Sequence, residues 1–295
     1  MAEIVTVKGL PADYEVACTS DWHCGSRAFH EQALDRLIAW VRASKKRYLG
    51  FGGDAIEGKR VDSPHFNPDG LRTGQLTMGP QLEYVRDRIR PIADSVLWWN
   101  LGNHDIYCKD ADLVRSIVME PLGIRDRLGG YQTWVELLGK GAPLRGHIFH
   151  GHRSLPRGAK DPIQKRGNQN AWLVNELYHL AGDVHFHLMG HVHALLVQQP
   201  VEQYALLTGA GGVRARYFVE PEQPVETHGN DGATDSRRYI PPRARWYGCT
   251  GTLRRSGGFG YTDYAEIAGY PPSPIGWLVM KVRGGVVRDL APVIV

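Results

Sequence analysis

Residues 14–23 read YEVACTSDWH, an apolar run that ends in polar and charged side chains. The part from Tyr14 to Thr19 is typical of a short buried β-strand. Asp21 and His23 follow it at a spacing of two, so in an extended backbone their side chains point to the same side. A carboxylate and an imidazole at the end of this strand are therefore placed to bind one cation.

Four later segments repeat this arrangement, each after a short apolar run that is predicted to be a strand, at residues 48–51, 96–101, 145–150 and 185–189. The polar residues at these ends are Asp54, then Asn103, His104 and Asp105, then His150 and His152, and finally His191 and His193. Sites in open α/β sheets form outside the carboxyl ends of strands, so we expect the five segments to converge on one metal site. Mixed carboxylate, amide and imidazole ligands suit Mn²⁺, Fe, Zn²⁺ or Ni²⁺.

Helical patterns alternate with these strands. In residues 30–43 the apolar positions recur with a helical period, and further helices are predicted at 75–93, 111–119 and 169–180. A strand is expected at 131–138. This alternation predicts an α/β fold with helices on the outer faces of the sheets.

The composition is that of a globular protein, since 42% of the 295 residues are hydrophobic and a full core can be buried. A net charge of +4 gives only a mild bias towards anionic partners. The first residues lack the pattern of a signal peptide, and no apolar run approaches the roughly 18 residues that span a bilayer, so no membrane partner is expected. Four scattered cysteines without CxxC spacing favour reduced thiols in a cytoplasmic protein.

The series D-x-H, G-D, G-N-H-D, H-G and G-H-x-H, in this order from Asp21 to His193, resembles the calcineurin-like metallophosphoesterase superfamily. The resemblance implies a four-layer α/β/β/α sandwich with two divalent metal ions at the strand ends, and a hydrolase that acts on phosphoesters. We interpret residues 1–295 as one domain. The Gly-, Pro- and Arg-rich region of about 213–262 is interpreted as an insertion or long loops, and strands at about 276–295 are expected to close the domain.

The resemblance also implies a role for each residue that matches the series. One ion would be bound by Asp21, His23 and His193, and the other by Asn103, His150 and His191. Asp54 would bridge the two ions, which we expect to be Mn²⁺. A hydroxide that bridges the ions would attack the phosphorus, His104 would approach the scissile phosphate, and Asp105 would orient neighbouring groups.

Basic residues near the series are candidates for substrate contacts. These candidates are His152 and Arg153, just after His150, and Arg237, Arg238, Arg243 and Arg245 in the later region. Aromatic residues lie among the second set, and arginines beside aromatic rings can bind phosphates and stack on bases. A solvated loop is the alternative interpretation of the same charges.

The motif details favour one branch of the superfamily. Protein phosphatases carry G-D-x-V-D-R-G and G-N-H-E, whereas residues 53–58 here read GDAIEG and residues 102–105 read GNHD. The sequence is closer to the nuclease and phosphodiesterase branches, so we expect a phosphodiesterase that acts on DNA, RNA or nucleotides. A broad phosphomonoesterase and a non-catalytic binding scaffold stay open as alternatives. The oligomeric state is not indicated.

Overall fold

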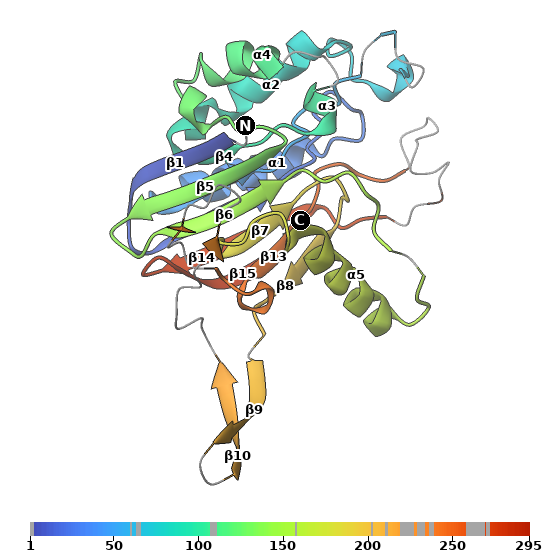
Figure 1. Cartoon of the computed structure of the whole chain (residues 1–295). Helices are drawn as coiled ribbons and strands as arrows, with labels where there is room; N and C mark the ends of the chain where they lie inside the picture. The colour runs from blue at the N-terminus through green and yellow to red at the C-terminus, as the bar shows by residue number, and fades with distance from the viewer. Residues whose placement is uncertain are drawn as a thin grey trace.

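The computed structural model describes residues 3–59, 61–62, 66–106, 111–156, 158–201, 203–209, 212–218, 227–228, 234–235, 239–257, 269 and 272–295. Two β-sheets face each other, and helices cover the outer face of each (Figure 1). The predicted α/β class and the α/β/β/α layers are confirmed.

The first sheet contains β2 (Tyr14–Thr19), β3 (Arg47–Phe51), β4 (Val96–Trp99), β14 (Gly276–Arg283) and β15 (Val286–Ile294), in the order β15-β14-β2-β3-β4. The three strands β2, β3 and β4 are parallel. The hairpin of β14 and β15 turns at Gly284 and Gly285, which have φ of 61° and 81°. A chain segment near residue 280 therefore completes the sheet that begins at residue 14.

The second sheet has the order β1-β5-β6-β7-β13-β8. Its strands are β1 (Glu3–Leu10), β5 (Gln132–Gly139), β6 (Leu144–Phe149), β7 (Phe186–Met189), β8 (Leu195–Gln198) and β13 (Trp246–Thr250). The strands β6, β7 and β13 run parallel to one another. The sequence did not predict β1, which pairs with β5.

Part of the region of about 213–262, which was predicted to be an insertion or long loops, belongs to the main fold. The strand β13 lies inside the second sheet, between β7 and β8. Its five residues, WYGCT, show no alternation that would mark a strand. Gly248 is required at its centre, since a Cβ there would lie 2.6 Å from Leu278 of the facing sheet. The strand is thus defined by packing between the sheets.

The helices are α1 (Glu31–Arg42), α2 (Met78–Ile89), α3 (Asn103–Ile106), α4 (Ala111–Val114) and α5 (Pro162–Leu177). Short helical turns lie at Pro68–Gly70, Arg90–Ser95, Arg115–Met119, Arg125–Arg127 and Pro242–Ala244. The apolar side of α1, including Leu34 and Leu37, packs with Leu49 and Trp99 of the first sheet. On the opposite side of the molecule, α5 packs through Leu173 on the second sheet.

A hairpin of β9 (Gln203–Gly209) and β10 (Gly212–Phe218) projects from this body (Figure 1). A further pair is β11 (Thr227–His228) with β12 (Thr234–Asp235). None of the described helices is long and apolar enough to cross a membrane. Among the described cysteines, Cys18, Cys24 and Cys249 are buried free thiols.

The parallel strands bring the polar segments to one end of the two sheets. Loops after β2, β3 and β4 come from the first sheet, and loops after β6 and β7 come from the second. The core between the sheets contains residues such as Val16 and Ile148, each almost fully buried. This core holds the two sets of loops opposite one another.

Candidate metal centre

The loops at this end have a strained backbone at the residues that the sequence selected. Asp21, His23, Asp54, His191 and His193 have φ between 51° and 67°, and they are the only non-glycine residues with positive φ in the described ranges. Side chains with a Cβ rarely adopt this left-handed conformation, which costs about 1–3 kcal/mol for each residue. Such strain persists where the surroundings enforce it, and it gathers at functional sites.

The first group of candidate ligands consists of Asp21, His23 and His193. The Nε2 atoms of His23 and His193 lie 3.1 Å apart. Oδ1 of Asp21 lies 3.3 Å from Nε2 of His193 and 3.9 Å from Nε2 of His23. The three side chains therefore direct one donor atom each towards a common point.

The second group consists of Asn103, His150 and His191. Oδ1 of Asn103 lies 3.1 Å from Nε2 of His150 and 3.0 Å from Nδ1 of His191. The other ring nitrogen of His150, Nδ1, donates to the carbonyl of Gly52 at 2.9 Å. Since a carbonyl only accepts, Nε2 of the neutral ring offers its lone pair to the group.

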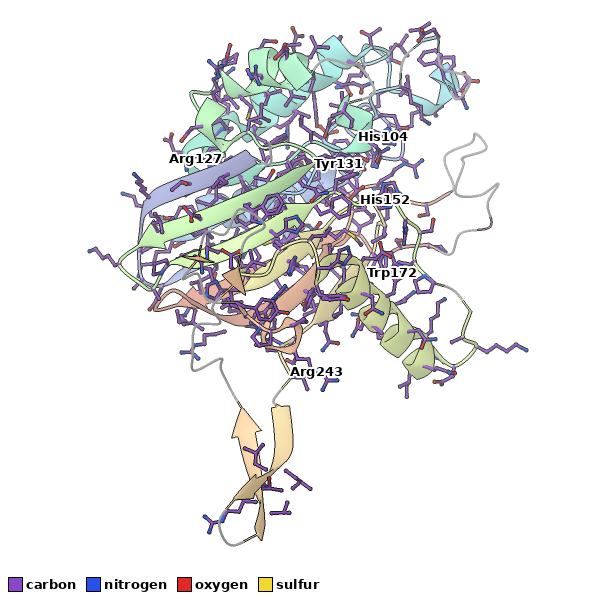
Figure 2. The ribbon with its side chains drawn as sticks, viewed as in Figure 1. His104, Arg127, Tyr131, His152, Trp172 and Arg243 are labelled. Atoms are coloured by element: carbon purple, nitrogen blue, oxygen red, sulfur yellow. The ribbon has the colours of Figure 1, made fainter. Side chains whose placement is uncertain are left out.

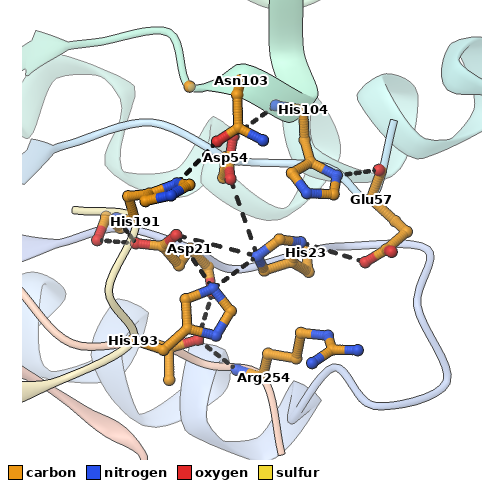
Figure 3. A network of polar contacts seen from close by, with 12 residues as sticks. Asp21, His23, Asp54, Glu57, Asn103, His104, His191, His193 and Arg254 are labelled. Atoms are coloured by element: carbon orange, nitrogen blue, oxygen red, sulfur yellow. Dashed lines mark hydrogen bonds and ion pairs between the residues drawn. The ribbon is translucent and has the colours of Figure 1, made fainter. Parts of the chain in front are cut away.

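Asp54 lies between the two groups (Figure 3). Its Oδ2 is 3.2 Å from Nε2 of His150 and 3.9 Å from Nε2 of His23. The close approach of the Asp54 loop depends on Gly102, because a Cβ there would lie 2.0 Å from Oδ1 of Asp54. The glycine before Asn103 thus serves the contact between loops that follow β3 and β4.

The donor atoms fit divalent cations. Oδ2 of Asp21 accepts hydrogen bonds from the Ser20 hydroxyl and the His191 backbone N–H, whereas its buried Oδ1 has no hydrogen-bond partner among the described residues. A buried carboxylate oxygen without a partner is costly unless a cation satisfies it. Carboxylate, amide and imidazole donors of this kind suit Mn²⁺, Fe, Zn²⁺ or Ni²⁺.

The electrostatics favour cations as well. Burial raises the pKa of the Asp21 carboxyl, but His193 and His150 outweigh this effect and hold the pKa below its ordinary value. The pKa of Asp54 is also lowered, against its burial, by His150 and His104. Burial lowers the pKa of His23 to about 4. The two carboxylates therefore stay ionised and the His23 ring stays neutral at neutral pH. Burial also lowers the pKa of His150, but Asp54 outweighs this effect and raises that pKa to about 9.

Asp105 and His104 have different positions. The Asp105 carboxylate accepts from the backbone N–H groups of Asp54, Ala55 and Gly102 at 2.7, 3.0 and 2.9 Å, so it ties two loops together. The backbone N–H of His104 donates to Oδ1 of Asp54 at 2.8 Å. Burial lowers the pKa of His104, but Asp54 and Glu57 overcome this and raise it above its ordinary value.

Several residues that support the site were not named as ligands or catalytic residues from the sequence. The hydroxyl of Ser20 contacts that of Thr250 at 2.7 Å, and Thr252 donates to the Asp21 carbonyl at 2.8 Å. Both threonines come from the end of β13, in the region interpreted as an insertion. Glu57 contacts His23 at 3.2 Å, and Arg254 lies beside His193 in Figure 3. The one local signal was the position of Glu57 three residues after Asp54.

The predicted substrate contacts have mixed outcomes. His152 and Arg153 are exposed, and Arg153 pairs with Glu176 of α5 at 3.0 Å. Arg243 lies near the base of the β9–β10 hairpin and away from His104 (Figure 2). It precedes the amino end of β13, whereas the candidate metal site lies at the carboxyl ends of the strands. Arg237 and Arg238 lie outside the described residues.

Arg245 was wrongly predicted to contact substrate. It is fully buried, and its guanidinium donates to the carbonyls of Ile240, Tyr178, Ala181 and Gly182. The last three carbonyls follow the end of α5, where backbone acceptors have no partner within the helix. Its charge therefore stabilises the fold on the outer side of the second sheet.

Comparisons with known proteins add a likeness of overall structure. No protein-family model and no curated protein matches the sequence. Vps29 of Chaetomium thermophilum is similar with a TM-score of 0.38 and 11% identity, over 96% of this chain and 97% of that one. NAD nucleotidase (NadN) of Haemophilus influenzae has a TM-score of 0.40 and 9% sequence identity, and the match covers 96% of this chain and 50% of that one. GAP50, the anchor in the inner membrane complex of Plasmodium, has a TM-score of 0.37 and 8% sequence identity, and the match covers 97% of this chain and 90% of that one.

This chain thus spans about half the length of NadN. TM-scores of 0.37 to 0.40 do not assign an activity to it. The donor atoms at the strand ends, and the strain of the backbone that holds them, are observed directly in this chain.

Proposed function

We propose that the protein is a divalent-metal-dependent phosphoester hydrolase that cleaves phosphodiesters of nucleic acid or nucleotides. The observation that carries the proposal is the position of Asp54 between the two groups of donors, which suits a carboxylate shared by two ions. Asp21, His23 and His193 would hold one ion, and Asn103, His150 and His191 the other. When bound, such a pair activates water and neutralises phosphoryl oxygens. We propose Mn²⁺ as the ion.

His104 is the proposed catalytic residue outside the two groups. Its Nδ1 donates to the carbonyl of Glu57 at 2.5 Å, and Nε2 is the ring atom that we propose meets substrate. The raised pKa of His104 favours a proton on that nitrogen. The proton would pass to the leaving oxygen as the ester bond breaks.

The preference for diesters has two supports. The segment Gly102-Asn103-His104-Asp105 resembles the nuclease and phosphodiesterase branches rather than the protein phosphatases. Arg254 lies beside His193, and we propose that its guanidinium contacts a second phosphate oxygen or an adjacent phosphate. Arg245 gives no support, because it is used inside the fold.

A substrate panel tests the proposal. Metal-free protein is supplied with Mn²⁺ and given bis(p-nitrophenyl) phosphate, single-stranded DNA and RNA, alongside the monoester p-nitrophenyl phosphate. We expect faster hydrolysis of the diesters, and a loss of at least about 100-fold in Asp54→Asn. Asparagine tolerates positive φ, so this variant keeps the backbone. Cleavage of the monoester alone would refute the diester preference, and a protein that neither binds ions nor turns over any substrate would be a scaffold.

A further inference from the structure

Glu57 is a buried carboxylate beside the metal centre. Its side chain is 5% exposed, so its charge is poorly screened by solvent. Its Oε1 lies 3.1 Å from Nζ of Lys59, and its Oε2 lies 3.2 Å from Nδ1 of His23. Neither Oε2 of Glu57 nor Nδ1 of His23 makes a hydrogen bond in the described residues, so the 3.2 Å ion-pair contact is the polar contact that the two atoms share. Each of these two buried atoms therefore depends on the other.

This contact determines which nitrogen of His23 can bind an ion. An ionised carboxylate only accepts hydrogen bonds, so the nitrogen that faces Glu57 is the one that carries the hydrogen. In the neutral ring the lone pair is then on Nε2. That atom lies 3.1 Å from Nε2 of His193 and 3.9 Å from Oδ1 of Asp21, inside the first group of donors.

The backbone of the same residue holds His104. The carbonyl of Glu57 accepts from Nδ1 of His104 at 2.5 Å, whereas the side chain faces His23. Figure 3 shows both contacts on the loop that follows Asp54. A substitution of the side chain removes the first contact and keeps the carbonyl, so the two contacts can be separated by experiment.

We propose that the Glu57 carboxylate is a positioning residue that fixes the ring orientation and tautomer of His23, and so sets the affinity of the Asp21–His23–His193 group for its ion. Histidines that bind metals commonly donate their other ring N–H to a carboxylate or carbonyl, and loss of that partner costs about 10- to 100-fold in affinity. His150 has such a partner in the Gly52 carbonyl, and Glu57 supplies it for His23. The proposal rests on the proposed function only in treating this group as a metal site.

Mn²⁺ binding to the metal-free protein, measured by calorimetry, tests the proposal. We expect Glu57→Ala to weaken one class of site by about 10- to 100-fold and to leave the other class unchanged. Glu57→Gln should retain much of the affinity, because its amide oxygen can still accept from Nδ1–H. The matched control is Glu15→Gln, which removes a carboxylate paired with Arg47 at the other end of β2. It should bind both ions like the wild type.

The tautomer of His23 gives a second measurement that needs no ion. Long-range ¹H–¹⁵N NMR of the metal-free wild type should show the proton on Nδ1, and Glu57→Ala should show a mixture of tautomers. Unchanged affinities in both Glu57 variants, or equal weakening of both classes of site, would overturn the proposal. If Glu57→Ala does not fold, Glu57→Gln and the wild-type tautomer decide. Wild type that binds two ions without turnover would overturn the proposed function alone.

Discussion

His23 and Asp21 show how a single residue of this site is held on two sides. One oxygen of Asp21 is taken by the Ser20 hydroxyl and the His191 backbone N–H, which leaves the other oxygen for an ion. One nitrogen of His23 faces Glu57, which leaves the other nitrogen for the same ion. The strained φ values of 53° and 52° aim both side chains inward.

At the residue scale, we predict the effect of removing the His104 ring on the rate of hydrolysis. His104→Ala should keep both ions, since the ring belongs to neither of the two proposed ligand groups, and should lose about 100- to 10,000-fold in kcat. The loss should be greater for alkyl esters than for nitrophenyl esters, because a poor leaving group needs the proton more. Steady-state rates on a series of leaving groups measure this. Exposed His179, changed to alanine, is the control, and an equal loss for all leaving groups would contradict the role.

The sequence was informative about residues that act with their neighbours in the chain. Asp21 with His23, and His191 with His193, could be recognised because two-residue spacing and strand ends are local features. Ser20 and Thr250 meet across 230 residues, and no local pattern shows that contact. Glu57 was passed over because an acid in a loop is common, and its position three residues after Asp54 became informative once its burial was known.

At the scale of elements, β13 has a role at each of its two ends. Its carboxyl end supplies Thr250 to the metal centre, and Arg245, just before its amino end, binds carbonyls beyond α5. Its position between β7 and β8 was not predictable, since its five residues lack a period and the surrounding arginines resemble a loop. The elements α1 and β2 have clear patterns and were predicted within about a residue, whereas the helix predicted at 169–180 was found as α5 at Pro162–Leu177.

Arg245→Met tests the structural role of this arginine. The buried carbonyls of Tyr178, Ala181 and Gly182 would lose their donor, so the free energy of unfolding should fall by about 3 kcal/mol. Urea denaturation measures the change, and Mn²⁺ affinity should be unaffected. Arg243→Met, at an exposed position, should change stability by less than about 0.5 kcal/mol. If Arg245→Met had normal stability but lost turnover, the structural role would be contradicted and Arg245 would again be a candidate substrate contact.

Two buried histidines on β6 and β7 make stability depend on pH. His147 and His187 contact each other through Nδ1 at 3.2 Å, and burial lowers the pKa of His147 to about 4, from 6.5. Between these values the unfolded chain binds a proton that the folded chain does not. The free energy of unfolding should therefore fall as the pH falls through this window, by at most about 1.4 kcal/mol per pH unit.

His147→Gln removes this dependence while keeping a polar side chain. Urea denaturation of the metal-free protein, near pH 6.5 and again near pH 4.5, should show a smaller loss on acidification in the variant, by an amount on the order of 2 kcal/mol. Other groups titrate in both proteins, so the difference between them isolates His147. Equal losses in the two proteins would show that the fold does not lower the pKa of His147.

At the scale of the whole molecule, the two sheets act as a frame that places five loops at one end. The core between them fixes the loops after β2, β3 and β4 opposite those after β6 and β7. The β9–β10 hairpin pairs only with itself among the described strands and stands away from this end (Figure 1). The candidate metal centre therefore depends on the sandwich and on the end of β13, which brings Thr250 to it.

A titration of metal-free protein with Mn²⁺, in which bound metal and phosphoester hydrolysis are followed together, tests the central claim most directly. The structure predicts that binding saturates at two ions per chain and that hydrolysis rises with occupancy of the pair. The claim would be contradicted if the protein bound no ion, or if it bound ions and hydrolysed no phosphoester with Mn²⁺, Fe²⁺, Zn²⁺ or Ni²⁺.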